Sequence, residues 1–577
     1  MYKAKMSVPT AVGVKGSDMY ENAGDPRVTL SMQLVRGAAP GAICNGMNDI
    51  WSVGTAKSIE DAVVLAFQTR DIRGGKGEKA LFNQMWQCIY EKHPELAISL
   101  VPLIPEYGSW NDVVHFAAKT PAEPFLDLLV KQILADEAAF AANVEAPKLS
   151  LVSKWAPREG KQFDAVAKQL ALRLSAHVAG LQMSQRLATY RKRMAKLNSV
   201  LKTVETFECS GRWDEIDPKL VPGRAREIKK AAYLNENVKG RALRHPNNEK
   251  RMTCREHFQA FFQKAASGEV KINGSQTLYP HEIVKKAVAL LGRETEDDRN
   301  SLNAVWDAMV ADARAKGGLG RSIVMCDFSG SMQSSGGCSG SMQSSAASDT
   351  PYWVSMAMGI LISSVTTDEF KDMLMTFDSD PKWFKFGVEE KTLFQKLQAL
   401  QNAGHIGQGT STDFQKALDL VLATLKMQRV RPGSEPKDLI VVTDMGWDQA
   451  CASDQRGFWT GHSYRHVVKT EQKQTHIQMA REAFKRAGED LWSTAWTVPR
   501  IVIWNVAATG PLAHAQSTEE GVIMLAGWSP SLFKVLCADG AKVQNPYDGL
   551  REQLDDPRYD AVRTVVRTWA EGGWRLL

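Results

Sequence analysis

The feature that most constrains the fold of this chain is a set of short, almost wholly apolar runs in its second half. The runs are 321–326 (RSIVMC), 370–377 (FKDMLMTF), 438–442 (DLIVV), 500–506 (RIVIWNV) and 521–525 (GVIML). Helix-like segments separate them, at 351–365, 392–400, 412–425 and 474–487. Apolar strands that alternate with helices are typical of a parallel sheet covered on both faces. We therefore predict an α/β, doubly wound (Rossmann-like) domain in the second half.

The first half follows a different pattern, because its apolar residues recur at helical spacing from about residue 58 to 302. Residues 58–61 (SIED) form a helix-start signature, and Ile59, Val63 and Phe67 then fall on one helix face. Proline and glycine punctuate the later helical segments. We predict an all-α, HEAT-like helical-repeat domain at 1–316 and the α/β domain at 317–577, with the change at the glycine-rich stretch 316–320.

Length and charge set broad limits on the class of protein. A chain of 577 residues predicts two or three domains, and a net charge of +6 is a mild basic bias compatible with an acidic partner. No apolar stretch suits a signal peptide or a membrane span, so we expect a cytoplasmic protein. The eight cysteines contain no CxxC pair, and we expect them to be reduced core thiols.

Side chains that carry oxygen atoms lie directly after two of the predicted parallel strands and at the start of one predicted helix. Asp327, Ser329 and Ser331 come directly after the first strand, and Asp444 closes a later strand. Thr412 opens the helix that follows the loop 407–411. Sites in such sheets form beyond the carboxyl ends of the strands, and an all-oxygen ligand set suits Mg²⁺, Mn²⁺ or Ca²⁺. The alternative is a serine-rich surface loop with aspartates that cap helices.

A seven-residue sequence, SGSMQSS, occurs at 329–335 and again at 339–345. The second copy has Gly337 at the position that corresponds to Asp327, and no strand precedes it. Only the first copy therefore has the carboxylate that a metal site needs. The second copy is either a neutral duplication or a segment that hangs over the metal.

Residues 320–538 resemble a von Willebrand factor A domain, on the basis of the DFSGS motif at 327–331, Thr412 and Asp444. This resemblance implies a metal-ion-dependent adhesion site, in which the two serines bind the metal directly. It also implies that the threonine binds directly or through water, and that the aspartates act largely through water.

Other segments, such as RDIRGGKGEK at 70–79, IPEYGSWND at 104–112 and KWAP at 154–157, resemble an uncharacterised, domain-of-unknown-function family of viruses and cellular organisms. A helical domain followed by an A domain is also the plan of the TROVE family, typified by the Ro autoantigen. That similarity implies a ring of helical repeats, closed by the A domain, that binds structured RNA and single-stranded RNA ends.

Basic clusters in the first half fit this expectation. Residues 219–255 hold eleven Lys and Arg against three Glu, and Trp155 and Tyr190 lie within other basic stretches. Such clusters suit phosphate contacts and base stacking, although solvated helix faces have the same composition. The glycines of 73–78 predict an interhelical turn rather than a phosphate loop. The candidate RNA-binding residues are Arg70, Arg73, Lys76, Lys154, Arg158, Arg191, Arg193, Arg224, Arg226, Lys229 and Lys230.

These observations predict a non-catalytic, Ro-like RNA-binding protein with a magnesium site in its A domain. No motif places a nucleophile or a general base, so we do not expect an enzyme. The rival hypothesis is a protein-interaction or assembly scaffold, whose metal accepts a carboxylate from a protein partner and whose basic surface is incidental.

Overall fold

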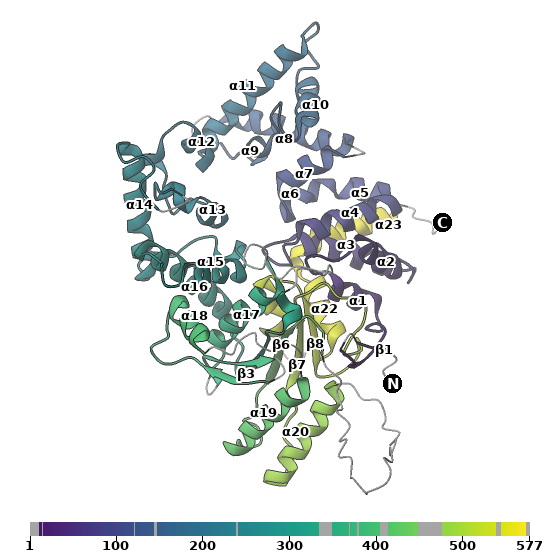
Figure 1. The fold of residues 1–577 in the computed structure, drawn as a ribbon. Coiled ribbons are helices and arrows are strands. Elements are labelled where there is room, and N and C mark those ends of the chain that lie inside the picture. Colours follow the sequence, from purple (N-terminus) through teal and green to yellow (C-terminus); the bar gives the residue numbers. More distant parts are fainter. Residues whose placement is uncertain are drawn as a thin grey trace, which may run out of the picture.

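The computed structural model describes residues 11–572, apart from 14, 120–121, 144–146, 238–240, 334–348, 368–369, 378–379, 404–412, 448–475 and 538–543. Figure 1 shows a long arc of helices and a sheet layered between further helices. Within the described residues, no helix is both long enough and apolar enough to cross a membrane.

The arc begins after a small antiparallel hairpin of β1 (Ala11–Val12) and β2 (Asp18–Met19). Its helices are α1 (Pro26–Gln33), α2 (Pro40–Trp51), α3 (Ala56–Arg70), α4 (Lys79–Lys92), α5 (Pro94–Leu100), α6 (Ile104–Tyr107), α7 (Trp110–Ala117), α8 (Glu123–Ala142), α9 (Val152–Trp155), α10 (Asp164–Leu174), α11 (Met183–Leu201), α12 (Val204–Cys209), α13 (Gly223–Tyr233), α14 (Glu249–Ala266), α15 (Pro280–Leu290) and α16 (Glu296–Ala315). Local signals start several of them. Proline occupies the first turn of α1, α2, α5 and α15, and Thr295 with Asp298 forms a capping box on α16.

The α/β part contains a six-stranded sheet with strand order β5-β4-β3-β6-β7-β8. The strands are β3 (Ser322–Asp327), β4 (Met373–Phe377), β5 (Trp383–Lys385), β6 (Asp438–Thr443), β7 (Arg500–Asn505) and β8 (Val522–Ala526). The helices of this part are α17 (Pro351–Val365), α18 (Leu393–Asn402), α19 (Phe414–Met427), α20 (His476–Trp492), α21 (Phe533–Cys537), α22 (Pro546–Leu554) and α23 (Asp560–Glu571).

The prediction of a helical first half and an α/β second half is confirmed. Neighbouring strands from β4 through β3, β6, β7 and β8 are all parallel, and every residue of β3 and β6 is buried. Short apolar runs form these strands because both faces of the sheet are covered, for example by α17 on β3, β4 and β6. The antiparallel edge strand β5 has no counterpart among the predicted strands.

The helical arc contacts the α/β part at both of its ends (Figure 1). At the first end of the arc, α22 and α23 pack on α3. At the second end, α15 and α16 contact α17 and α18. Between these ends, ion pairs join different helices of the arc, such as Lys154–Glu205 at 3.1 Å from α9 to α12 and Lys229–Glu208 at 2.6 Å from α12 to α13. Helix lengths range from four residues in α6 to 20 in α8, so the HEAT-like repeat stays a prediction.

Each end of the chain packs on the other part of the protein. The first described residues pack on the α/β part, where the backbones of Tyr20 and Ala513 exchange two hydrogen bonds and the Asn505 amide donates to the carbonyl of Met32 at 2.9 Å. At the other end, α22 and α23 pack on α3, the first long helix of the arc. The sequence change near residue 316 therefore does not separate two independent packing units.

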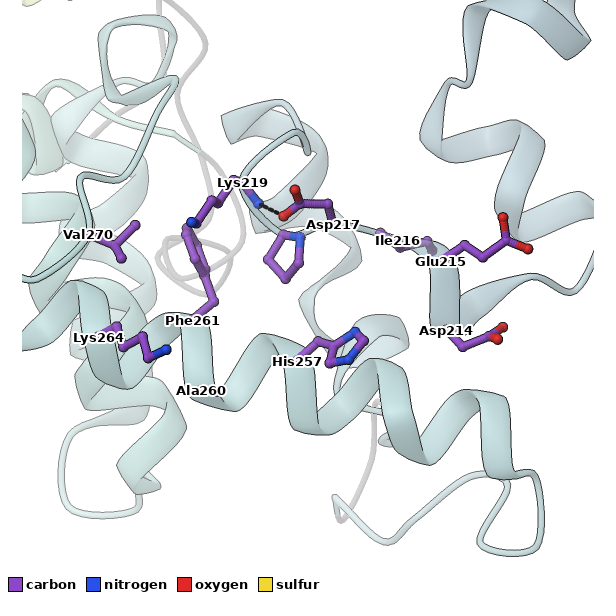
Figure 2. A pocket seen from close by; sticks show the side chains of 11 residues that line it. Asp214, Glu215, Ile216, Asp217, Lys219, His257, Ala260, Phe261, Lys264 and Val270 are labelled. Atoms are coloured by element: carbon purple, nitrogen blue, oxygen red, sulfur yellow. Dashed lines mark hydrogen bonds between the residues drawn. The ribbon is translucent and has the colours of Figure 1, made fainter.

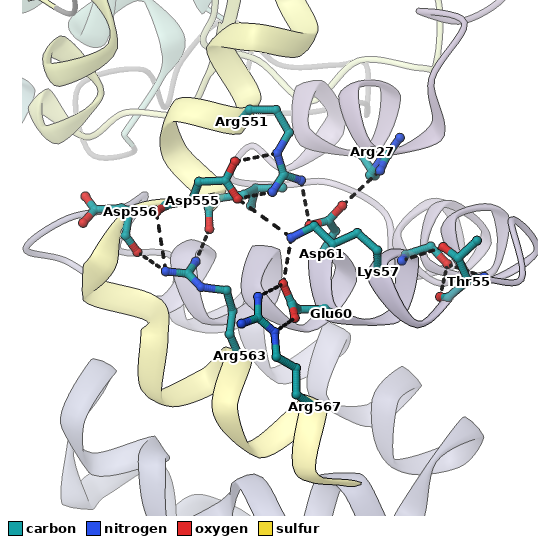
Figure 3. A network of polar contacts seen from close by, with 12 residues as sticks. Arg27, Thr55, Lys57, Glu60, Asp61, Arg551, Asp555, Asp556, Arg563 and Arg567 are labelled. Carbon is teal, nitrogen blue, oxygen red and sulfur yellow. Dashed lines mark hydrogen bonds and ion pairs between the residues drawn. The ribbon is translucent and has the colours of Figure 1, made fainter. Parts of the chain in front are cut away.

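A network of ion pairs fastens α22 and α23 to α3 (Figure 3). Asp61 of α3 is 1% exposed and accepts hydrogen bonds from Arg27 at 3.0 Å and from Arg551 of α22 at 2.7 Å. The neighbouring Glu60 accepts from Arg567 of α23 at 2.6 Å. We call this network the α3–α22/α23 seam.

One structural feature overturns an expectation about the cysteines. Cys44 of α2 and Cys88 of α4 form a disulfide, so the prediction that all thiols are reduced is wrong for this pair. The packing of α2 on α4 brings together two residues that lie 44 positions apart, which no local cysteine motif indicates. Among the described residues, Cys209, Cys254 and Cys326 are free.

Candidate metal and nucleic-acid sites

The predicted metal ligands Asp327 and Asp444 lie at the same edge of the sheet. Asp327 is the last residue of β3, and Asp444 directly follows β6, the parallel neighbour of β3. The strand order runs outward from β3 through β4 and β5 on one side and from β6 through β7 and β8 on the other. The pair β3–β6 is therefore the point at which the winding reverses, where open α/β sheets bind their ligands.

Asp327 is fully buried and held through both carboxylate oxygens. Its Oδ1 accepts the backbone N–H of Ser329 at 2.9 Å, and its Oδ2 accepts the hydroxyl of Thr443 at 2.9 Å. Thr443 in turn accepts hydrogen bonds from the backbone of Met445 and from the indole of Trp447, both at 3.1 Å. These contacts fix the carboxylate in one orientation.

The two predicted serine ligands lie beside this carboxylate. The Oγ atoms of Ser329 and Ser331 are 3.1 Å apart, with Ser329 buried and Ser331 exposed. Asp444 is partly buried, and its Oδ1 accepts the backbone N–H of Gly446 at 2.9 Å. The cluster thus runs from a buried carboxylate to a hydroxyl that is open to solvent.

Electrostatics at this edge favours a cation. Burial and the negative charge of Asp444 together raise the pKa of Asp327 to about 7, against the partial opposition of the hydrogen bonds from Ser329 and Thr443. Two carboxylates with two hydroxyls form a hard oxygen donor set, and a bound divalent ion would offset the repulsion between the acids. The residues present therefore fit Mg²⁺, Mn²⁺ or Ca²⁺.

The predicted ligand Thr412 lies outside the described residues, as does the second SGSMQSS copy at 339–345, which is not part of the predicted site. The helix that Thr412 is expected to open, α19, begins at Phe414, with the Asp413 side chain as its N-cap.

Sequence reasoning missed several residues at this edge. Trp447 stacks on Phe414 at 4.8 Å between ring centroids and on His514 at 3.9 Å. Burial lowers the pKa of His514 to about 3, so this imidazole is neutral at pH 7. Lys15 of the N-terminal hairpin places its Cε 3.6 Å from the position that a Cβ on Gly446 would occupy. Thr443 directly precedes the predicted Asp444, whereas no sequence signal connects Lys15 with this edge.

The turn 73–78 is built for packing rather than for ligand contact. A Cβ at Gly75 would lie 1.8 Å from the carbonyl oxygen of Gln68, so only glycine fits. Lys76 is 2% exposed and donates to the carbonyls of Ser31 at 2.6 Å and Leu34 at 3.1 Å. The prediction that Lys76 faces an RNA-binding surface is therefore wrong, because its ammonium caps the end of α1.

Most other candidate RNA-binding residues are bonded within the protein. Arg70 is 12% exposed and pairs with Asp112 at 2.7 Å. Seven more candidates each have a partner within the protein. The pairs are Lys154–Glu205, Arg191–Glu159, Arg193–Glu137, Arg224–Glu282, Arg226–Asn273 carbonyl, Lys229–Glu208 and Lys230–Asp298. Arg226 is fully buried. Much of the basic excess in the sequence therefore joins helices of the arc.

Arg73 and Arg158 are exposed, and neither guanidinium has an ion-pair partner within the part of the chain that the structure describes. Arg158 follows Trp155, whose indole is 39% exposed, and precedes the exposed Lys161. Tyr190 of α11 bonds to the carbonyl of Pro157 at 2.9 Å and fixes this turn. We call Trp155, Arg158 and Lys161 the Trp155 patch.

A second acidic cluster, His281, Glu282 and Asp349, has ligand atoms within 4.8 Å of one another. Its carboxylates are already compensated, because Asp349 pairs with Lys285 at 3.0 Å and Glu282 with Arg224 at 3.1 Å. Burial, together with the neighbouring positive charge of Arg36, lowers the pKa of His281 to about 3. These surrounding cations disfavour a divalent metal here.

Comparisons with known proteins extend these observations. Residues 122–319 match a family described as a domain of unknown function (DUF2828), and residues 321–565 match a second such family (DUF7788). The chain is also 23% identical over 559 residues to an uncharacterized protein of Acanthamoeba polyphaga mimivirus, across 94% of this chain and 86% of that protein. The expected similarity to uncharacterised, domain-of-unknown-function proteins is confirmed, and one similar protein is viral.

Proposed function

We propose that this protein is a non-catalytic RNA-binding protein of Ro-like plan. In this proposal the α/β part is a von Willebrand factor A domain with a metal-ion-dependent adhesion site. Asp327, Ser329, Ser331, Thr412 and Asp444 hold Mg²⁺, directly or through water. The helical arc carries the RNA.

Two observations support the A domain. The strand order reverses between β3 and β6, and the two aspartates follow these two strands. A divalent ion would supply a positive charge and an open coordination position at this edge. The hydrogen bonds from Ser329 and Thr443 orient the Asp327 carboxylate for metal binding. Metal binding of this kind requires no catalytic nucleophile or base.

The Trp155 patch is the observation that carries the RNA proposal. A half-exposed indole offers a stacking surface for a base, and Arg158 and Lys161 offer charge that no carboxylate of the described residues neutralises. Base stacking on one aromatic side chain contributes about 1–3 kcal/mol, so this patch is sufficient to change affinity measurably.

The test is RNA binding by the full chain, measured by filter binding with a structured and a single-stranded RNA at several salt concentrations. We expect Trp155→Ala to weaken binding by about tenfold or more, and Arg158→Glu with Lys161→Glu to weaken it further and reduce the salt dependence. Lys485→Glu, an exposed position on α20, is the matched control. Protein that purifies from its native host without nucleic acid, and that binds neither RNA, would contradict the proposal.

A metal-dependent interaction scaffold is the second candidate. It is favoured by the internal pairing of most basic residues and by the exposed Ser331 hydroxyl at the edge of the metal cluster. Here the metal accepts a carboxylate from a protein partner. This function predicts partner capture that both EDTA and Asp327→Ala abolish, and capture that survives both treatments would reject it.

A further inference from the structure

A cavity lies in the arc, between α14 and the segment that follows the short 3₁₀ helix at Trp213–Glu215 (Figure 2). Its volume is about 410 Å³, within the range of about 300–1,000 Å³ that is usual for small-molecule pockets. His257, Ala260 and Lys264 of α14 line one wall at spacings of three and four residues, which places them on one helix face. Residues 214–219 line the opposite wall.

The pocket is polar at its two ends, and the ends carry opposite charges. Figure 2 shows Lys219 and Lys264 toward one end and Asp214 and Glu215 toward the other. Both lysines are exposed, and neither ammonium has an ion-pair partner within the described chain. Asp217 also lines the pocket beside Lys219, where its carboxylate accepts the backbone N–H of Lys219 at 2.9 Å. An anionic group that enters this end therefore meets two ammonium groups whose charge Asp217 partly offsets.

The acidic end is partly compensated and offers hydrogen-bond acceptors. Glu215 pairs with Arg212 at 3.2 Å, and Asp214 lies 3.8 Å from the ammonium of Lys250. The Asp214 and Glu215 side chains are 35% and 48% exposed, so their accessible carboxylate oxygens can accept hydrogen bonds from hydroxyl or amino groups of a ligand.

The pocket also has apolar walls. Ile216 is 2% exposed and Phe261 is 5% exposed; Figure 2 shows Phe261 and Val270 on the side of Lys264 and Ile216 beside Glu215. A ligand that fills the pocket therefore combines an anionic group, a flat or apolar part and hydrogen-bond donors. A nucleotide combines these properties in its phosphate, its base, and its ribose hydroxyls or base amino group.

We propose that this pocket binds one nucleoside monophosphate unit, either as a free nucleotide or within single-stranded RNA. The phosphate lies toward Lys219 and Lys264, and donor groups of the ribose or base face Asp214 and Glu215. The inference deepens the proposed RNA-binding function, and only its RNA-borne form rests on that function.

Calorimetric titration of the full chain with AMP and CMP tests the proposal. The comparison ligands are adenosine, inorganic phosphate and an Ala-Ala dipeptide. We expect AMP and CMP to bind at least about tenfold more tightly than adenosine, which lacks the phosphate, or phosphate, which leaves the acidic end unused. Equal affinity for adenosine, or tighter binding of the dipeptide, would overturn the assignment of the ligand.

The exposed position Ala260 allows the pocket to be closed without disturbing the core. Ala260→Trp is expected to lower AMP affinity at least about tenfold, and Lys264→Gln to lower it less. Gln263→Trp, an exposed position of α14 that does not line the pocket, is the control and should leave the affinity unchanged. Unchanged AMP binding by Ala260→Trp would place the nucleotide elsewhere and overturn the proposal.

The RNA-binding function is tested separately at the Trp155 patch. Trp155→Ala should weaken RNA binding and leave AMP binding intact. AMP binding that depends on Ala260, in a protein that binds no RNA, would support the pocket and overturn the RNA-borne form.

Discussion

The helical arc and the α/β part are held together by different interactions. In the α/β part, apolar strands are buried on both faces, and ligand-type polar groups gather at one edge, beyond β3 and β6. In the arc, ion pairs join different helices, as between Arg193 of α11 and Glu137 of α8. The positive charge of the arc is therefore largely structural, whereas at the sheet edge the charge of Asp444 raises the pKa of Asp327.

This difference bears on how basic composition is interpreted. Residues 219–255 hold eleven Lys and Arg, yet Lys229, Lys230 and Arg226 all bond within the protein. An excess of basic residues predicts a nucleic-acid surface only if no acceptor within the protein binds those residues. Here the acceptors come from other helices, so local composition does not reveal them. The following predictions test the contrast, from the largest expected effect to the smallest.

The largest effect is expected where the two parts meet, at the α3–α22/α23 seam. Asp61→Asn removes the buried anion that Arg27, Lys57 and Arg551 share, and it should lower the free energy of unfolding by about 3–5 kcal/mol because three cations around this buried position lose their common carboxylate. Urea denaturation of the full chain measures this. Asp555→Asn, at a side chain that is 54% exposed, should cost less than about 1 kcal/mol. Equal effects of the two variants would show that the seam contributes no more than a surface pair.

A smaller effect, with a distinct pH dependence, is expected within the arc at Asp298. Burial would raise the pKa of Asp298, but Lys230, the Thr295 backbone and Arg241 lower it to about 2. Because the pKa in the folded state is below the unfolded value of about 3.9, this carboxylate stabilises the arc above about pH 4. That contribution, roughly 2 kcal/mol, is lost as the pH falls toward 2.

Asp298→Asn should therefore lower stability at pH 7 and flatten the stability profile between about pH 4 and 2. Stability of the wild type and the variant, measured across this range by urea denaturation, checks the sign. A variant with an unchanged acid profile would show that the Lys230–Asp298 contact is not stabilising.

At the sheet edge, Thr443→Val should weaken metal binding by about tenfold, although Thr443 is not one of the proposed metal ligands. Thr443 donates to Asp327, and partners that orient a ligand typically contribute about 10–100-fold to metal affinity. Titration with Mn²⁺, followed by electron paramagnetic resonance, measures this. Thr424→Val on α19, which removes a hydrogen bond to Trp383 instead, should leave the affinity unchanged.

The smallest effect is expected from the duplicated loop. Deletion of residues 339–345 should change Mn²⁺ affinity by less than about twofold, because the second copy has the serines without the acid. Asp327→Ala, which removes the acid of the first copy, should abolish binding in the same assay. Loss of metal on the deletion would show that the second copy contributes ligands.

The contrast also explains which features could be predicted from sequence. Strands such as β3 and β6 were predictable, because burial on both faces leaves a continuous apolar run. The start of α3 was less predictable. The SIED pattern indicated a start at Ser58, whereas Thr55 is the N-cap, and Glu60 and Asp61 form ion pairs with Arg567 and Arg551 in the α3–α22/α23 seam. Lys76, Lys15 and the Cys44–Cys88 disulfide depend on packing between distant elements, for which the sequence carries no periodic signal.

The packing of each chain end on the other part of the protein has a consequence for biosynthesis. Asp61 and Arg551 are separated by 490 residues, so the carboxylates of α3 leave the ribosome long before their arginine partners exist. Until then, Glu60 and Asp61 remain without α22 and α23, and the arc lacks one of its attachments to the α/β part. The seam can therefore form only after α22 and α23 have been synthesised. A nascent chain that stops before residue 551 leaves this face of α3 uncovered by α22 and α23.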